Sequence, residues 1–144
     1  MVQIKKINMA EEGLNRFFGP LEARIMDILW TSGDLSIKEV QVILSQESSI
    51  SVNAVMTVMN RLMDKGHLTK AVVGGGRNRV SKFSPIQSKE QFLMEQTKAL
   101  TQSLVQEYGG LVVNHMVDAL DDVDPELIKR LETKLIEMKN GKLP

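Results

Sequence analysis

Residues 51–85, SVNAVMTVMNRLMDKGHLTKAVVGGGRNRVSKFSP, decide the fold of this chain. Their first half predicts a helix that begins after Ser51, an N-cap residue type, and ends at Gly66. Four apolar residues recur there on one helical face: Val52, Val55, Met59 and Leu62. The second half predicts a β-hairpin, because two β-prone runs, Leu68–Val73 and Arg79–Phe83, flank a glycine cluster.

Two more helices are predicted before this stretch. Gly19-Pro20 predicts the start of one, which Gly33 ends, and Ser36 and Glu39 have the spacing of a capping box that starts the other. Three helices and a hairpin are the order of a winged helix-turn-helix domain. The third helix of such a domain enters the DNA major groove, and its hairpin, the wing, reaches the backbone or minor groove. We expect this domain over residues 1–86.

Residues 87–144 predict a helical region. A capped helix begins at Ser88, Gly109-Gly110 interrupts the pattern, and Asp124-Pro125 begins the last helix. Apolar stripes run along helices that are too small to enclose a core alone, so we expect this region to dimerise. The candidate contacts are Leu100, Leu104, Leu111, Met116, Leu120, Leu127, Leu131 and Leu135. The expected fold class is mainly α with a small β-hairpin wing.

The basic residues are unevenly placed, although the 144-residue chain has 18 Lys and Arg against 18 Asp and Glu. Ile50–Lys82 holds one acid, Asp64, and six basic residues: Arg61, Lys65, Lys70, Arg77, Arg79 and Lys82. A basic block on a neutral protein is typical of a polyanion partner, although lysines are also common on solvated surfaces. The positions favour nucleic acid, because the charges fall late on the third helix and at the wing.

The polar face of the third helix supplies candidates for reading bases. Asn53, Thr57 and Asn60 are short side chains suited to base edges, and asparagine can pair bidentately with adenine. The alternative is that they are ordinary exposed polar residues. Ser51 is expected to cap the helix, and its hydroxyl is also a candidate donor to a phosphate.

Arginines supply the candidates for binding phosphates. Arg77 and Arg79 at the wing are expected to contact the DNA backbone, with Lys65 or Lys82 as further candidates. Arg61 has two interpretations of equal weight: a phosphate contact, or an ion pair within the protein that holds the wing.

Three segments resemble one known family. Leu21–Trp30 reads LEARIMDILW, Val55–Gly66 reads VMTVMNRLMDKG, and Arg77–Pro85 ends in FSP. The family is that of the penicillinase repressor (BlaI/MecI/CopY), and the resemblance covers residues 18–140. The first segment is similar to the family's first helix, and the second to its recognition-helix pattern V-x-T-x-x-x-R-L-x-x-K-G. The third is similar to its wing strand, which usually ends in Y-x-P. The resemblance implies a homodimeric transcriptional repressor. Such a repressor binds an inverted-repeat operator in double-stranded DNA, commonly built on TACA/TGTA, and blocks promoter access.

The chain departs from this family at three places. It has no cysteine, so sensing through the C-terminal Cys-x-Cys motifs of the copper-responsive branch is excluded. The β-lactam branch is induced by proteolysis of an Asn–Phe bond, and this chain has Asp118-Ala119 at the aligned position. The cleavage site is thus not matched, and the residues select no inducing ligand or sensor protease. Asn53 and Ala54 stand where the family often has a basic residue and a threonine, which makes Ala54 a further candidate at the DNA.

Other function classes find no support in the sequence. Without an HExxH, GxSxG, phosphate-loop or Rossmann pattern, we expect no enzyme, cofactor or metal site. Without a long apolar run or a signal peptide, we expect a cytoplasmic protein with no membrane partner. The alternative function is a winged-helix protein-interaction or assembly module without sequence-specific DNA binding, which would show no salt-dependent DNA affinity.

Histidines and methionines receive structural interpretations. His67 is expected at the surface or as a capping residue, and His115 at the dimer interface. Met56, Met59 and Met63 are expected to pack adaptably in the core.

Overall fold

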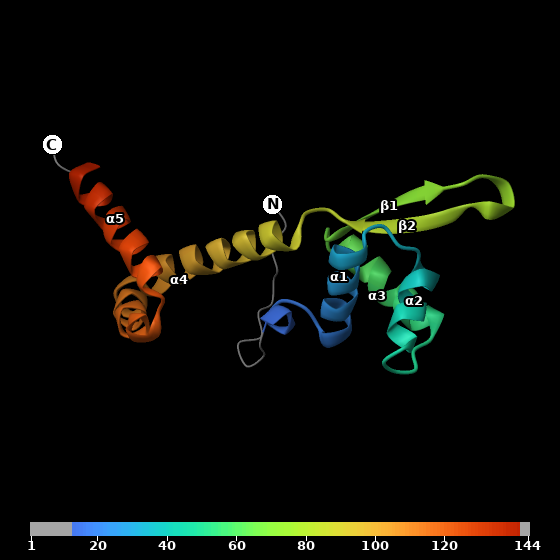
Figure 1. Ribbon diagram of the computed structural model, residues 1–144, viewed down its shortest axis with the longest axis horizontal. Helices are drawn as coiled ribbons and strands as arrows, with labels where there is room; N and C mark the ends of the chain where they lie inside the picture. Colours follow the sequence, from blue (N-terminus) through green and yellow to red (C-terminus); the bar gives the residue numbers. More distant parts are fainter. Residues whose placement is uncertain (1–12, 142–144) are drawn as a thin grey trace. The chain divides into compact units, whose positions relative to one another are not determined.

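A computed structural model describes residues 13–141 and divides into two compact units between Thr97 and Lys98. The first unit contains a 3-10 turn (Gly13–Arg16), α1 (Pro20–Ser32), α2 (Ile37–Ser45), α3 (Val52–Asp64), β1 (Leu68–Val73), β2 (Val80–Pro85) and the first turns of α4 (Lys89–Ala119). The second contains the rest of α4, a 3-10 turn (Leu120–Asp122) and α5 (Pro125–Gly141). Three helices followed by a hairpin confirm the winged helix-turn-helix (Figure 1).

The predicted helix caps form as hydrogen bonds between residues three apart. The backbone N–H of Glu39 donates to Ser36 Oγ at 3.1 Å, and the N–H of Ser36 donates to Glu39 Oε1 at 3.0 Å, which is a complete capping box. Ser88 and Gln91 repeat this pattern at the start of α4, with both distances at 3.1 Å. These caps satisfy N–H groups that the first helical turn leaves without a partner.

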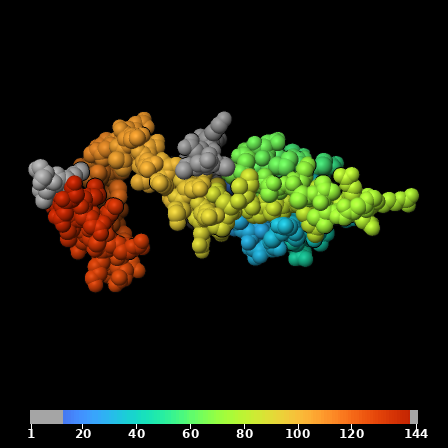
Figure 2. Space-filling view, turned by 90° about the horizontal axis from the view of Figure 1, so that it is seen from above, coloured from blue at the N-terminus to red at the C-terminus, as the bar shows by residue number. Residues whose placement is uncertain are grey.

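The hairpin is antiparallel and is held to the helices through its second strand. Its register pairs Leu68 with Pro85 and Val73 with Val80. Phe83 exchanges two backbone hydrogen bonds with Leu35 in the segment between α1 and α2, at 2.8 and 3.2 Å. The hairpin is therefore fixed at its base, while its tip projects beyond the helices of the first unit (Figure 2).

The core of the first unit is built around α1, with α3, β2 and the start of α4 contributing aliphatic and aromatic side chains. Phe83 and Phe92 are almost fully buried, at 1% and 0% exposure. Phe92, in the first turn of α4, stacks on Phe18 with ring centroids 5.1 Å apart and also contacts Trp30 at 5.5 Å. The Trp30 indole N–H donates to the carbonyl oxygen of Gln87 at 3.0 Å. These contacts attach the start of α4 to the winged-helix unit.

His67 lies in this core, so the expectation of a surface position is wrong. Its backbone does cap α3: the N–H of His67 donates to Leu62 O at 2.9 Å and the N–H of Gly66 donates to Met63 O at 3.0 Å, in a Schellman motif with Gly66 at φ +86°. Its ring is 6% exposed and packs edge-on against Phe18, with centroids 5.0 Å apart. The chain turns inward after the cap, and sequence spacing alone does not reveal that turn.

The second unit has helices but no buried side chain among residues 98–141. The expected interruption of α4 occurs at Gly109, where φ is 3° and ψ is −82°. Asp124 begins α5, because its Oδ1 accepts from the N–H of Glu126 at 3.0 Å. Large apolar side chains remain exposed on both helices, including Leu111 at 62% and Ile136 at 59%. This unit thus lacks a core of its own.

Within residues 13–141, no helix combines the length and apolar character needed to cross a bilayer.

Candidate nucleic-acid interface

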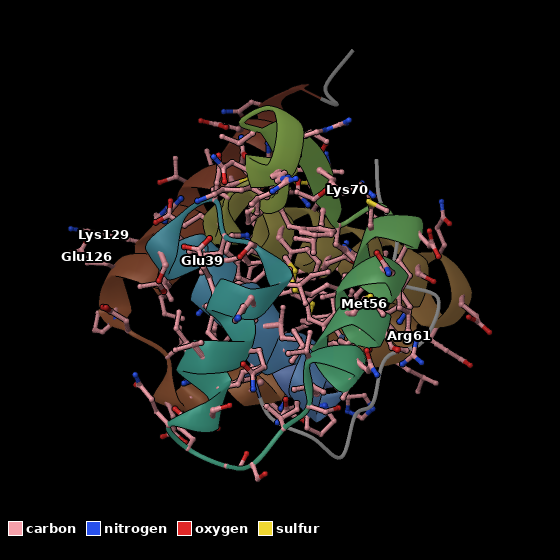
Figure 3. The ribbon with its side chains drawn as sticks, turned by 90° about the vertical axis from the view of Figure 1, so that its right-hand side faces the viewer. Glu39, Met56, Arg61, Lys70, Glu126 and Lys129 are labelled. Atoms are coloured by element: carbon pink, nitrogen blue, oxygen red, sulfur yellow. The ribbon has the colours of Figure 1, made fainter. Side chains whose placement is uncertain are left out.

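The surface of α3 that faces away from the core presents two rows of side chains spaced one helical turn apart. The apolar row consists of Val52 and Met56, which are 43% and 39% exposed. The polar row consists of Asn53, Thr57 and Arg61, all exposed. Asn60 continues the line of the apolar row and is half-buried. Figure 3 labels Met56 and Arg61 on this helix.

Two of the predicted DNA contacts near the start of α3, Ser51 and Ala54, are less suited to bind bases than the polar row. Ser51 Oγ accepts from the N–H of Ala54 at 3.1 Å, so the expected cap is present. Ala54 is half-buried and has no polar side chain to offer a base. Ser51 itself remains exposed, and its hydroxyl hydrogen is not used in the cap.

Thr57 is exposed, but its hydroxyl already donates to the carbonyl oxygen of Asn53 at 2.9 Å. Such a bond to the preceding turn uses the hydroxyl hydrogen, so that the hydroxyl oxygen can offer a base only an acceptor. The N–H donors on this face therefore belong to the amides of Asn53 and Asn60 and to the guanidinium group of Arg61.

The wing tip is a short glycine-rich turn that carries Arg77 and Arg79. Arg77 lies in a 3-10 turn, Gly76–Asn78, and Arg79 follows it; both are exposed. Gly74 has φ +82°, and a Cβ there would lie 2.5 Å from the carbonyl oxygen of Asn78. Only glycine fits this position without displacing the backbone, so the sequence of the tip fixes where the two arginines emerge.

The six basic residues of the block divide into two groups. Lys65 Nζ lies 2.9 Å from Glu22 Oε2, and Lys82 Nζ lies 3.2 Å from Glu39 Oε1. The other four are exposed and take part in none of the ion pairs found among residues 13–141: Arg61, Lys70, Arg77 and Arg79. The described residues thus give no support to an ion pair of Arg61 that holds the wing. The lysines do link elements, α3 to α1 and β2 to α2.

Glu22 is the anchor of the first of these links. Its carboxylate accepts from Lys65 and, at 3.1 Å, from the N–H of Gly19. Burial by itself raises the pKa of Glu22, but the hydrogen bonds from Lys65 and Gly19 outweigh burial and hold the pKa below its ordinary value. Glu22 is therefore charged at neutral pH and fixes the C-terminal end of α3 against α1.

Sequence reasoning missed the exposed apolar row, and although it placed Lys70 in the basic block, it did not single out Lys70 as a phosphate contact. The core-facing residues of α3 are Val55, Val58, Met59 and Leu62, so Val58 takes the place assigned to Val52. Including Val58 in the apolar stripe turns its centre away from Val52 and Met56. The expectation that Met56 packs in the core is therefore wrong, while Met59 is fully buried. Lys70 lies on β1 opposite Phe83 of β2, and its Nζ is 6.0 Å from the centre of the Phe83 ring (Figure 3).

The candidate dimerisation residues all lie in the second unit, on α4, on the 3-10 turn Leu120–Asp122 or on α5. Four are half-buried: Leu100, Leu104, Leu120 and Leu131. Four are exposed: Leu111, Met116, Leu127 and Leu135. His115 is exposed as well. Within residues 13–141, no three His, Asp or Glu side chains come together in an arrangement that could hold a metal ion.

Comparisons with known proteins give one family model and several similar solved structures. The model of the penicillinase repressor family matches residues 18–137. No curated protein gives a significant match. Among solved structures, the chain is similar to Bacillus subtilis PadR in complex with operator DNA, at 17% identity and a TM-score of 0.45, over 85% of this chain and 75% of that one.

Two further solved structures are similar. A PadR-family transcriptional regulator from Eggerthella lenta matches at 21% identity and a TM-score of 0.41, over 64% of this chain and 87% of that one. A MarR/EmrR-family transcriptional regulator from Acinetobacter matches at 18% identity and a TM-score of 0.40, over 89% of this chain and 79% of that one.

Proposed function

The chain belongs to the penicillinase repressor family, which makes it a transcriptional regulator, and from this premise we propose that it represses transcription as a homodimer bound to an inverted-repeat operator. Each subunit places α3 in the major groove of one half-site and its wing against the adjacent backbone. The bound dimer then blocks access of polymerase to an overlapping promoter.

The observation that carries this proposal is the coincidence of two kinds of surface on one unit. The exposed face of α3 offers the amides of Asn53 and Asn60, which can discriminate bases at about 1–3 kcal/mol per bidentate contact. The same unit carries, on α3 and on the hairpin, four basic side chains without an ion pair among the described residues: Arg61, Lys70, Arg77 and Arg79. Base contacts supply specificity and phosphate contacts supply affinity, so both requirements of an operator-binding protein are met.

The second unit supports the homodimer. It buries no side chain of its own among residues 98–141 and leaves apolar residues exposed along both helices. Large apolar side chains left exposed along both helices are typical of an interaction surface, and a second copy of the same helices supplies matching apolar side chains. A two-fold dimer also accounts for an inverted repeat, because the operator symmetry mirrors the protein symmetry.

The test is selection of duplexes from a randomised pool by the purified full chain, followed by fluorescence anisotropy with a selected duplex and its scrambled counterpart. We expect a selected sequence with two inverted half-sites, salt-dependent affinity, and a stoichiometry of two chains per duplex measured by analytical ultracentrifugation. Failure to enrich any sequence, with weak and equal affinity for both duplexes, would overturn the proposal and favour the protein-interaction module.

A further inference from the structure

Two exposed apolar side chains stand beside the polar row of α3, where a base-reading surface is expected to be polar. Val52 and Met56 are 43% and 39% exposed and are one helical turn apart. Single exposed apolar residues are common on protein surfaces. These two lie side by side on the element that the proposed function places in the major groove, next to Asn53 and Thr57.

The chemistry of the major groove supplies one apolar group that fits such a row. Thymine presents its C5-methyl group there, and no other base carries one. Its partner adenine presents the N6 amino group and N7, which an asparagine amide binds bidentately. A helix face with amides in one position and apolar side chains in the next thus matches an A·T pair and a neighbouring thymine.

We propose that Met56, with Val52 beside it, recognises thymine methyl groups in the operator half-site. The proposal rests on the proposed function, since it assumes that α3 enters the major groove. The unbranched thioether of methionine suits this role, because it adapts its shape to a methyl group and is polarizable. The side chain of Met56 is free to do so, since it is not part of the buried core.

Thr57, an exposed residue next to Met56 in the sequence, adds a γ-methyl group to this face of α3. The Thr57 hydroxyl donates to the Asn53 carbonyl oxygen, which leaves its hydrogen unavailable to a base. The middle of the exposed face of α3 is therefore less polar than its sequence suggests, and the hydrogen-bond donors are concentrated at Asn53, Asn60 and Arg61.

The experiment removes the methyl group alone, by replacing each thymine of the selected duplex with deoxyuridine in turn. For the wild-type chain we expect about fourfold weaker binding at one or two half-site positions, the change that corresponds to burial of one methyl-sized apolar group. Met56→Ala should bind thymine and uracil equally at one of these positions. Met56→Gln, which keeps the length of the side chain, should lose the thymine preference there as well.

Met94→Ala is the matched control, because Met94 is 68% exposed and lies on α4 rather than on α3. It should keep the full preference of the wild-type chain for thymine. Unchanged thermal unfolding of the Met56 variants by circular dichroism would show that they fold, as expected for a change at an exposed position.

Two outcomes separate this proposal from the proposed function. A wild-type chain that selects an operator but binds thymine and uracil equally at every position overturns the role of Met56 and leaves the repressor intact. Full retention of the fourfold preference by Met56→Ala does the same. A wild-type chain that selects no sequence overturns both proposals.

Discussion

The division of the basic block into paired and unpaired residues predicts how binding depends on salt. Each phosphate neutralised on B-DNA contributes about −0.9 to the slope of log K against log salt concentration. Four basic residues per chain take part in no ion pair of the described residues, so a dimer has eight and the slope should reach about −7 if all of them contact phosphates. Affinity should then fall by about 10⁴-fold between 50 and 200 mM salt.

Replacing Arg77 and Arg79 together by alanine removes four of these eight contacts from a dimer. The slope should fall by about half, to about −3.6, and the loss of affinity over the same salt range should shrink to about 100-fold. Because phosphate contacts carry no sequence information, the loss should be similar for the selected duplex and its scrambled counterpart. Fluorescence anisotropy at four or five salt concentrations measures both quantities.

Lys82→Ala is the matched control, because Lys82 lies on the same hairpin but its ammonium group is 3.2 Å from Glu39. We expect the slope to be unchanged in this variant. An undiminished slope in the Arg77/Arg79 double variant would refute the role of the wing. A slope reduced as much by Lys82→Ala as by a wing arginine would refute the use of ion pairing to choose the phosphate contacts.

Three further predictions concern the winged-helix unit. Phe92→Ala should lower the free energy of unfolding by about 3–5 kcal/mol in urea titrations, since Phe92 is fully buried, whereas a Met94→Ala control should change it by less than about 0.5 kcal/mol. Gly74→Ala should cost about 1–3 kcal/mol locally and weaken DNA binding through a displaced wing, whereas Gly75→Ala, whose Cβ would meet nothing within 4 Å, should not. Burial, aided by a nearby lysine, holds the pKa of His67 below its ordinary 6.5, so the folded state resists protonation. The contribution of His67 to the free energy of unfolding should therefore be complete above about pH 6.5 and decrease as the pH drops below it. The urea midpoint should fall less between pH 7.5 and 5.5 in the His67→Phe variant than in the wild-type chain.

The elements of the fold were predictable because their determinants are local. Ser36, Ser51 and Ser88 each cap a helix through a bond to a residue three positions later, which the sequence displays directly. The glycines of the hairpin tip and the Asp124-Pro125 pair act over equally short distances. Spacing alone therefore predicted the starts of these helices and the position of the wing.

The candidate site was only partly predictable, because its details depend on contacts between distant residues. Lys65 and Glu22 are 43 positions apart, and nothing in either segment indicates that they pair. His67 is buried because the chain turns inward against Phe18 and Phe92, which come from opposite ends of the unit. On α3, the predicted apolar stripe included Val52 instead of Val58, and Met56 was expected in the core although it is exposed.

These distant contacts converge on the C-terminal end of α3. Lys65 ties that end to Glu22 on α1, and His67 carries the following segment into the aromatic cluster with Phe92. The N-terminal end has the Ser51 cap, and the residues proposed to read bases begin directly after it. A recognition helix needs its side chains held to within about 0.5 Å to discriminate bases. We therefore expect Lys65 to position α3, and we expect the arginines and Lys70 to bind the phosphates.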